Sequence, residues 1–196
     1  VTADTATATQ LHDELSFFLS ESTLPILHFP DWETLPYDSF SPHQDIVSQR
    51  LSTLYELPQV TQGILVVPIT TLMHRIMPQG YLSGQSLVVE CGQSFDVEAM
   101  RMRLQRAGYH CVDTVYEHGE FAVRGSLIDL YPMGSKLPFR IDLFDDEVQT
   151  LRTFDPETQR TIERVDSISL LPAKEFPLNK VGIANFKEQW HERFNV

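Results

Sequence analysis

Short segments with a strand-like pattern fill the sequence after residue 108, and they limit the fold more than any other feature. Turn-forming glycines and the pairs Asp145-Asp146 and Asp155-Pro156 separate most of these segments. The pattern predicts strands over residues 109–117, 120–124, 126–131, 138–144, 147–154 and 159–171. We therefore expect a mostly antiparallel sheet in this part of the chain.

One strand and one helix precede those segments. The strand is predicted over residues 86–91. The helix begins after Asp96, a residue suited to cap a helix N-terminus, and runs to about Ala107. Gly108 follows at the position where glycine commonly ends a helix. A single helix combined with an antiparallel sheet is an α+β arrangement.

The first 86 residues are organised differently, because helical and strand-like patterns alternate along them. Helices are predicted over residues 4–20, 44–57 and 70–77, and strands over residues 24–29 and 63–68. The second strand is apolar at nearly every position, as in a parallel sheet that is covered on both faces. This alternation predicts an α/β layer.

The change of pattern divides the chain into three parts. We place the boundaries near residues 86 and 172, which gives a first part over 1–86, a middle part over 87–172 and a final part over 173–196. The final part contains a predicted helix from Asn179 to Phe194.

Composition argues against several classes of protein, although it leaves room for a small local basic site. The chain has 27 acidic and 15 basic residues and a net charge of −12, whereas nucleic-acid-binding and membrane-surface proteins need concentrated Lys and Arg. No apolar run approaches the roughly 18 residues of a membrane-spanning helix, so we expect no membrane partner. The two cysteines, Cys91 and Cys111, form no CxxC pair, which favours the reducing cytoplasm.

No motif of a catalytic, cofactor-binding or metal site occurs in the sequence. It lacks the GxxxxGK[ST] loop that binds nucleotide phosphates, the GxGxxG motif and the GxSxG motif. The seven histidines show no HExxH or paired spacing that would suit zinc. His118 with Glu120, and the acidic run at 145–147, are better explained as polar turns. We therefore predict a chain that is not an enzyme and holds no cofactor or metal.

Alternation along residues 138–144 separates a core face from an outer face, because successive strand residues point to opposite sides. The core face carries Phe139, Ile141 and Leu143. The outer face carries Arg140, Asp142 and Phe144. An exposed aromatic ring beside an arginine and an aspartate is common in protein interfaces.

The segment 120–124 extends this outer face. Phe121 and Val123 form its apolar side, so Arg124 points outward and joins the patch if the two strands are near neighbours. The alternative is an ordinary sheet face on which Arg140 pairs with Asp142 or with another acid. Such surface pairs contribute only about 0–1 kcal/mol.

Four stretches of the sequence resemble a known family. Residues 31–57 (DWETLPYDSFSPHQDIVSQRLSTLYEL) and 63–73 (GILVVPITTLM) are similar to the N-terminal region of the bacterial transcription-repair coupling factors. Residues 117–132 (EHGEFAVRGSLIDLYP) and 138–161 (PFRIDLFDDEVQTLRTFDPETQRT) resemble the same family and also the second domain of UvrB. The resemblance covers nearly the whole chain.

The resemblance implies a fold and a partner. It implies a degenerate helicase-like α/β domain, starting after its first strand and helix, that is interrupted by an inserted α+β domain contacting UvrA. The family's UvrA-contacting positions fall on Arg124, Arg140 and Phe144, and Asp142 joins them by geometry alone. The whole family protein is expected to be an ATP-driven DNA translocase that acts on stalled RNA polymerase through regions outside this chain.

Two other functions stay open at this point. One is a UvrB-like nucleotide-binding module, against which the missing phosphate loop argues. The other is direct DNA binding through Arg101, Arg103 and Arg106, for which the alternative is a solvated helix face.

Overall fold

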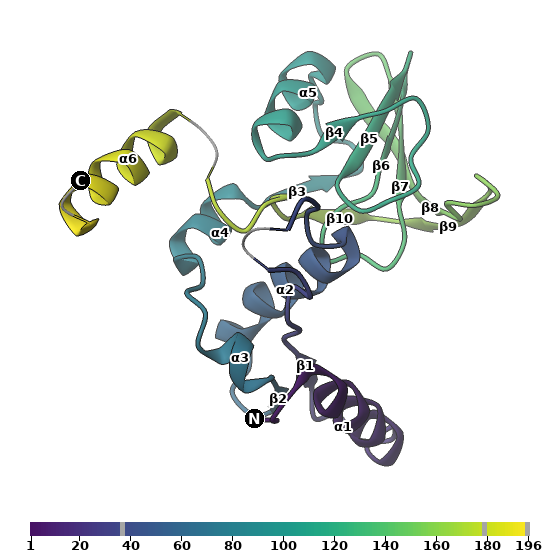
Figure 1. The fold of residues 1–196 in the computed structure, drawn as a ribbon. Coiled ribbons are helices and arrows are strands. Elements are labelled where there is room, and N and C mark those ends of the chain that lie inside the picture. The colour runs from purple at the N-terminus through teal and green to yellow at the C-terminus, as the bar shows by residue number, and fades with distance from the viewer. Residues whose placement is uncertain (36–37, 178–179, 195–196) are drawn as a thin grey trace.

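The computed structural model describes residues 1–35, 38–177 and 180–194, and within them the strands form three sheets (Figure 1). Two of these are two-stranded, and the third has six strands. The result is an α/β fold with mostly antiparallel pairing, as the sequence predicts for its middle part.

The first part alternates helices and strands as predicted. Its elements are α1 (Thr5–Phe18), β1 (Ile26–His28), α2 (Gln44–Glu56), the 3-10 turn η1 (Leu57–Gln59), β2 (Ile64–Val66), α3 (Ile69–Leu72) and α4 (Gln79–Gln85). The strands β1 and β2 pair in parallel, and α2 lies between this small sheet and the six-stranded sheet (Figure 1).

One predicted helix of the first part is wrong in extent. The prediction was one helix over 70–77, whereas α3 ends at Leu72 and a separate helix, α4, begins at Gln79. Pro78 disfavours helical geometry at Met77 before it, and Pro78 itself has an extended backbone as the N-cap residue of α4.

The middle part contains β3 (Leu87–Glu90), α5 (Val97–Arg106) and the six-stranded sheet. In spatial order the sheet consists of β4 (His110–Cys111), β5 (Glu120–Arg124), β6 (Leu127–Leu130), β7 (Phe139–Phe144), β8 (Glu147–Phe154) and β9 (Thr161–Val165). Only β4 and β5 pair in parallel within it. Asp96 caps α5 by accepting the N–H of Ala99 at 2.9 Å, as predicted.

Two predicted strands of the middle part are also wrong in extent. The segment 109–117 contributes only the two residues of β4. The segment 159–171 is not one strand, because it breaks at Asp166 into β9 and β10 (Ser167–Leu170). β9 pairs with β8, and β10 pairs with β3, so the chain changes sheets at this point.

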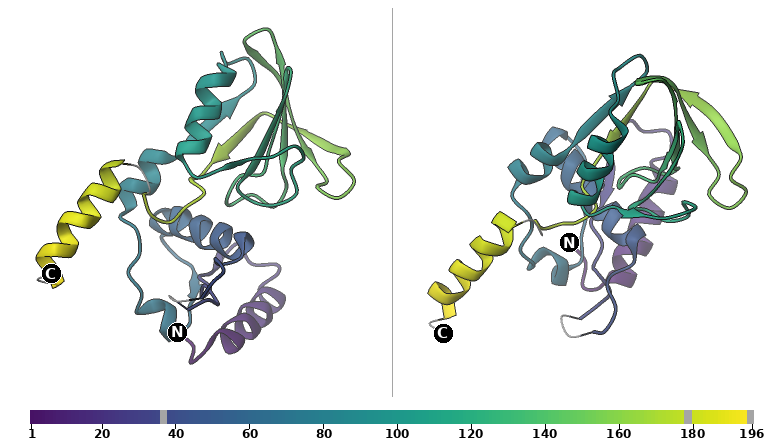
Figure 2. Two further views of the ribbon diagram at one scale, coloured as in Figure 1. Left: turned by 45° about the horizontal axis from the view of Figure 1, so that its top comes forward. Right: turned by 90° about the horizontal axis from the view of Figure 1, so that it is seen from above.

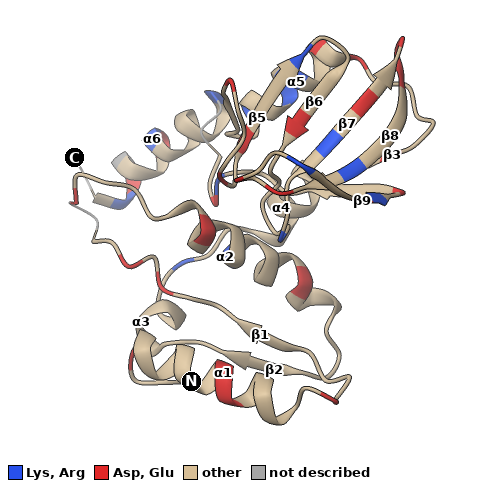
Figure 3. Ribbon diagram, turned by 90° about the vertical axis from the view of Figure 1, so that its right-hand side faces the viewer, with Lys and Arg blue, Asp and Glu red and all other residues tan. Residues whose placement is uncertain are grey.

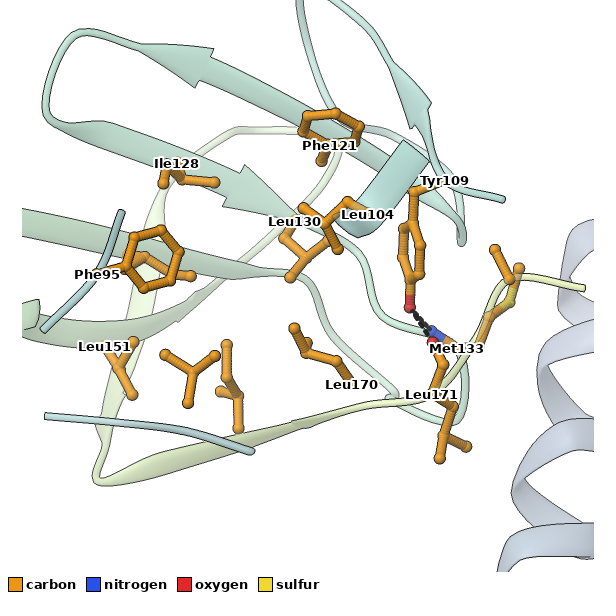
Figure 4. Packing of buried hydrophobic residues seen from close by; sticks show 14 of the residues in the cluster. Phe95, Leu104, Tyr109, Phe121, Ile128, Leu130, Met133, Leu151, Leu170 and Leu171 are labelled. Atoms are coloured by element: carbon orange, nitrogen blue, oxygen red, sulfur yellow. Dashed lines mark hydrogen bonds between the residues drawn. The ribbon is translucent and has the colours of Figure 1, made fainter. Parts of the chain in front are cut away.

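A single buried cluster joins α2, α5 and the inner face of the six-stranded sheet. Figure 4 shows its centre, which includes Phe121, Ile128 and Leu151 of the sheet and Leu104 of α5. Tyr109 donates its hydroxyl hydrogen to the Leu171 carbonyl at 2.6 Å, and burial raises its pKa. From α2 the cluster includes Val47 and Leu51, so the first part packs directly on the sheet.

The last helix, α6 (Lys180–Phe194), extends away from the sheets in all views (Figure 2). Its predicted first residue, Asn179, lies outside the described residues. The helicase-like assignment of residues 1–86 and 173–196, the domain boundaries and the inserted position of residues 87–172 stay predictions.

Candidate protein-interaction surface

The outer face of the six-stranded sheet is the side opposite the buried cluster, and we use this name for it below. The predicted alternation is confirmed on β7, where Ile141 and Leu143 are buried while Phe144 is exposed. On β5, Phe121 is buried on the inner side and Arg124 lies on the outer face.

Part of the outer face is covered by a second, smaller hydrophobic cluster. Val115, from the segment before β5, packs there with Ala122, Tyr131 and Phe154. Polar and charged residues occupy the neighbouring area, and Figure 3 marks the charged ones as red and blue segments of β6, β7 and β8. Phe154 of this cluster contacts the polar area through Arg140.

Asp129 on β6 is the centre of this polar area. Its carboxylate is fully buried and accepts two hydrogen bonds from Arg140, from Nε at 2.7 Å and from Nη2 at 2.9 Å. It also accepts a hydrogen bond from Nη2 of Arg124. The hydrogen bonds with Asp129 raise the pKa of Arg140 above its ordinary value. One carboxylate therefore fixes two arginines.

Further contacts hold Arg140 in place. Its guanidinium carbon lies 4.8 Å from the centre of the Phe154 ring, and Nη1 donates to the Gln159 carbonyl at 3.3 Å. The Arg140 side chain is 16% exposed and that of Arg124 is 46% exposed. Both arginines can therefore meet a partner without first being ordered.

Asp142 and Phe144 complete the patch on β7. Asp142 accepts a hydrogen bond from Nη2 of Arg152 on β8 at 2.7 Å, and both side chains are partly exposed. Phe144 is 66% exposed and stands opposite Glu147, at the turn where Asp145 takes a positive φ of 51°. Aspartate tolerates this left-handed conformation better than most residues.

The structure brings together all four predicted residues, with β6 inserted between the strands of Arg124 and Arg140. Arg140 pairs with Asp129, an acid other than Asp142, and Asp142 pairs with Arg152. Sequence reasoning missed Asp129 and Arg152. The same alternation, applied to residues 127–130, would have placed Asp129 on the outer face. It would not have found Arg152, because the β7–β8 register shifts between Asp142 and Leu143, so that Val148 and Leu151 both face the buried cluster.

The other candidate sites have structural explanations. Nδ1 of His118 lies 2.7 Å from a carboxylate oxygen of Asp45, and its Nε2 lies 2.7 Å from the Ser135 carbonyl. Glu120 accepts the backbone N–H groups of two loop residues, Tyr116 and Glu117. The described part of the chain contains no group of three or more His, Cys, Asp or Glu residues that could hold a metal ion.

The arginines considered for DNA binding, Arg101, Arg103 and Arg106, are all exposed on α5. Arg103 and Arg106 lie in the last turn, where positive charge complements the helix dipole. Among the described helices, none has both the length and the apolar character needed to cross a membrane.

Comparisons with known proteins identify the family of this chain. The sequence model of the UvrB interaction domain family matches residues 87–176. The transcription-repair-coupling factors of Escherichia coli (strain K12) and Haemophilus influenzae are 53% and 50% identical to the chain over 196 and 194 residues. That of Myxococcus xanthus is 35% identical over 180 residues.

These alignments cover 100%, 99% and 89% of this chain, but only 17%, 17% and 15% of the three relatives. The chain thus corresponds to about a sixth of the length of such a protein. It belongs to the transcription-repair coupling factor family, as an N-terminal UvrB-homology module that contains a UvrB interaction domain.

Proposed function

We propose that this chain is a non-catalytic docking module that binds the nucleotide-excision repair protein UvrA. By binding UvrA, it recruits repair to DNA damage at which transcription has stalled. Translocation on DNA and binding of RNA polymerase belong, in this proposal, to parts of the parent protein outside this chain. The parent acts in the cytoplasm, with which the two free cysteines are compatible.

A fixed arrangement of charge beside an exposed ring supports the proposal most strongly. Asp129 holds Arg124 and Arg140 in defined positions, and Phe144 is exposed on the same face. Arginines and aromatic rings carry a large share of the binding free energy in protein interfaces. Side chains that are already ordered lose little conformational entropy on binding.

We further propose that residues 87–172 form the docking domain, inserted into a degenerate helicase-like domain made of residues 1–86 and 173–196. The UvrB interaction domain match, over residues 87–176, supports the first assignment. Within this proposal the first part supports the sheet through α2 and has no nucleotide site, in keeping with the missing phosphate loop.

Titration of UvrA with the chain, by isothermal calorimetry at fixed salt, tests the proposal. We expect Phe144→Ala and Arg140→Ala to weaken binding about thirtyfold each, which corresponds to about 2 kcal/mol. The matched control is Phe18→Ala, because Phe18 on α1 is 79% exposed and lies far from the sheet in sequence. Circular dichroism checks that each variant folds.

Different outcomes distinguish the partner from the site. Binding by the unmodified chain and by Phe18→Ala, with loss in both outer-face variants, supports the docking role. Equal binding by all variants would place the contact elsewhere on the chain. Absence of binding by the unmodified, folded chain would contradict the docking role itself.

A further inference from the structure

A row of arginines crosses the outer face from β7 to β9. The strand register places Arg140 opposite Arg152, and Arg152 opposite Arg164. Adjacent strands lie about 4.8 Å apart, so the three side chains are lateral neighbours on one face. Part of this row is visible in Figure 3 as the blue segments of β7 and β8. Like charges directly opposite each other destabilise a sheet, so the row does not serve stability.

Carboxylates on the outer face balance only part of this positive charge. Asp129 is shared by Arg124 and Arg140, and Asp142 binds the next arginine in the row. Arg164 is exposed, and its side chain forms no ion pair with another residue in the part of the chain that the structure describes. Four arginines therefore face two carboxylates, in a chain whose net charge is −12.

The acidic residues near this row lie at its edges. The β7–β8 turn carries Asp145 and Asp146, and Glu147 follows opposite Phe144. On β9, Val165 points towards the buried cluster, so Arg164 points to the outer face. Glu163 points to the same side as Val165, away from the row of arginines. The excess positive charge thus runs across the strands from Arg124 on β5 to Arg164 on β9, and the acidic residues lie beside it.

We infer that the UvrA-docking surface extends over Arg152 and Arg164, and that this extension binds an acidic area of the partner protein. The inference rests on the proposed function above. Arg152 contacts the partner, while Asp142, whose carboxylate lies 2.7 Å from Nη2 of Arg152, positions that guanidinium. Asp142 is therefore a positioning residue in this surface.

A partner with a limited acidic patch fits this strip better than a nucleic acid does. A long nucleic acid would be repelled by the acidic turn at one end of the row and by the strongly negative net charge of the whole chain. A few carboxylates on a protein surface can meet the arginines alone. Phe144 then supplies the apolar contact beside them.

The variant Arg164→Glu gives the sharpest test, because its effects on folding and on binding have opposite signs. It places a glutamate opposite Arg152, so the like-charge pair becomes an opposite-charge pair and the folded state should be at least as stable. UvrA binding should weaken about tenfold, since the partner's carboxylates then face a negative charge. Loss of stability and binding together would indicate a merely structural role and would overturn the inference.

Two further variants complete the experiment, which uses calorimetric titration of UvrA and thermal unfolding. Arg152→Gln should weaken binding about fivefold, because a neutral side chain keeps the contact area but loses the charge. The control is Arg103→Glu, which makes the same change of charge at an exposed position on α5 and should change affinity less than about twofold.

The outcomes separate this inference from the proposed function. Unchanged binding by Arg164→Glu and Arg152→Gln, with loss in Phe144→Ala, would overturn the extension and leave the docking role in place. No binding by the unmodified chain would overturn both. An equal loss of binding in Arg103→Glu would reveal an effect of net charge and would overturn the extension. Binding of duplex DNA that depends on Arg164, combined with UvrA binding that does not, would also overturn it.

Discussion

Two arginine–carboxylate groups in this molecule have the same chemistry and different surroundings. Arg50 on α2 donates to both carboxylate oxygens of Glu175, at 2.6 and 3.1 Å, and to the Pro30 carbonyl at 2.6 Å. Its side chain is 0% exposed, and its guanidinium lies 4.5 Å from the centre of the Trp32 ring. On the outer face, Arg140 makes a similar two-point contact with Asp129 but keeps a side open to solvent.

The difference teaches that burial, more than pairing, decides what such a group does. The Arg50–Glu175 pair connects α2 to the segment after β10, and every face of it is covered. Its burial keeps it out of reach of a partner, so its role is structural. The buried carboxylate of Asp129 holds Arg124 and Arg140, and the parts of both side chains that face solvent remain accessible.

Breaking the buried pair should have the largest effect on stability. Arg50→Ala leaves the Glu175 carboxylate buried without its partner, which we expect to cost about 4 kcal/mol in the free energy of unfolding. Urea denaturation measures this cost. Glu175→Gln keeps the shape of the side chain, so it should also lower the free energy of unfolding, but by less. A decrease under about 1 kcal/mol in both variants would contradict a structural role for the pair.

Removing the shared carboxylate of the outer face should act on both stability and binding. Asp129→Ala frees Arg124 and Arg140 from their common acceptor, with an expected stability loss of about 2 kcal/mol after allowance for their partial exposure. UvrA affinity should fall about tenfold, because the arginines must then be ordered during binding. A fall in stability with unchanged affinity would show that their fixed positions do not matter to the partner.

Acid should weaken the first part through His28. Burial, with a smaller contribution from the charge of His12, lowers the pKa of His28. Below about pH 6.5 the unfolded chain therefore gains a proton that the folded chain does not take up. The free energy of unfolding should then fall as the pH drops from about 6.5 towards the lower pKa of the folded state.

Urea unfolding at several pH values, compared between the unmodified chain and His28→Gln, checks this expectation. The variant should show a smaller decrease over the same range, since it has no group at this position to protonate. An identical decrease in both proteins would assign the pH dependence to other groups.

The smallest expected effect on stability belongs to Arg124→Gln. Arg124 is 46% exposed, and Asp129 keeps its contact with Arg140 when Arg124 is neutralised. We expect a change of about 0–1 kcal/mol in the free energy of unfolding. A loss as large as that of Arg50→Ala would remove the distinction between the buried pair and the outer-face pairs.

Local signals in the sequence predicted the elements that depend on neighbouring residues. Asp96 caps α5 as expected, and alternation placed Ile141 inward and Phe144 outward. The break of the last strand at Asp166 was missed because each half pairs with a different sheet, which no local pattern records. Tertiary pairing there overrides a pattern that is compatible with one long strand.

The partners of the charged residues depend on how the strands are ordered in the sheet, which the sequence does not record. Pairing of Arg140 with Asp142 or another acid was only the alternative to an interface, and the choice of Asp129 depends on the order β5, β6, β7. The Arg50–Glu175 pair was missed entirely, because its members lie 125 residues apart and meet only in the folded chain. Hydrophobic spacing located α2 without revealing that its arginine is buried.

Photo-crosslinking tests most directly whether the outer face of the sheet is the docking surface. A benzophenone amino acid in place of Phe144 should crosslink to UvrA, and the same group in place of Phe18, an exposed phenylalanine on α1, should not. The predicted result is crosslinking from position 144 and its loss when excess unmodified chain competes for UvrA. Crosslinking from position 18 alone, or equally from both positions, would contradict the account.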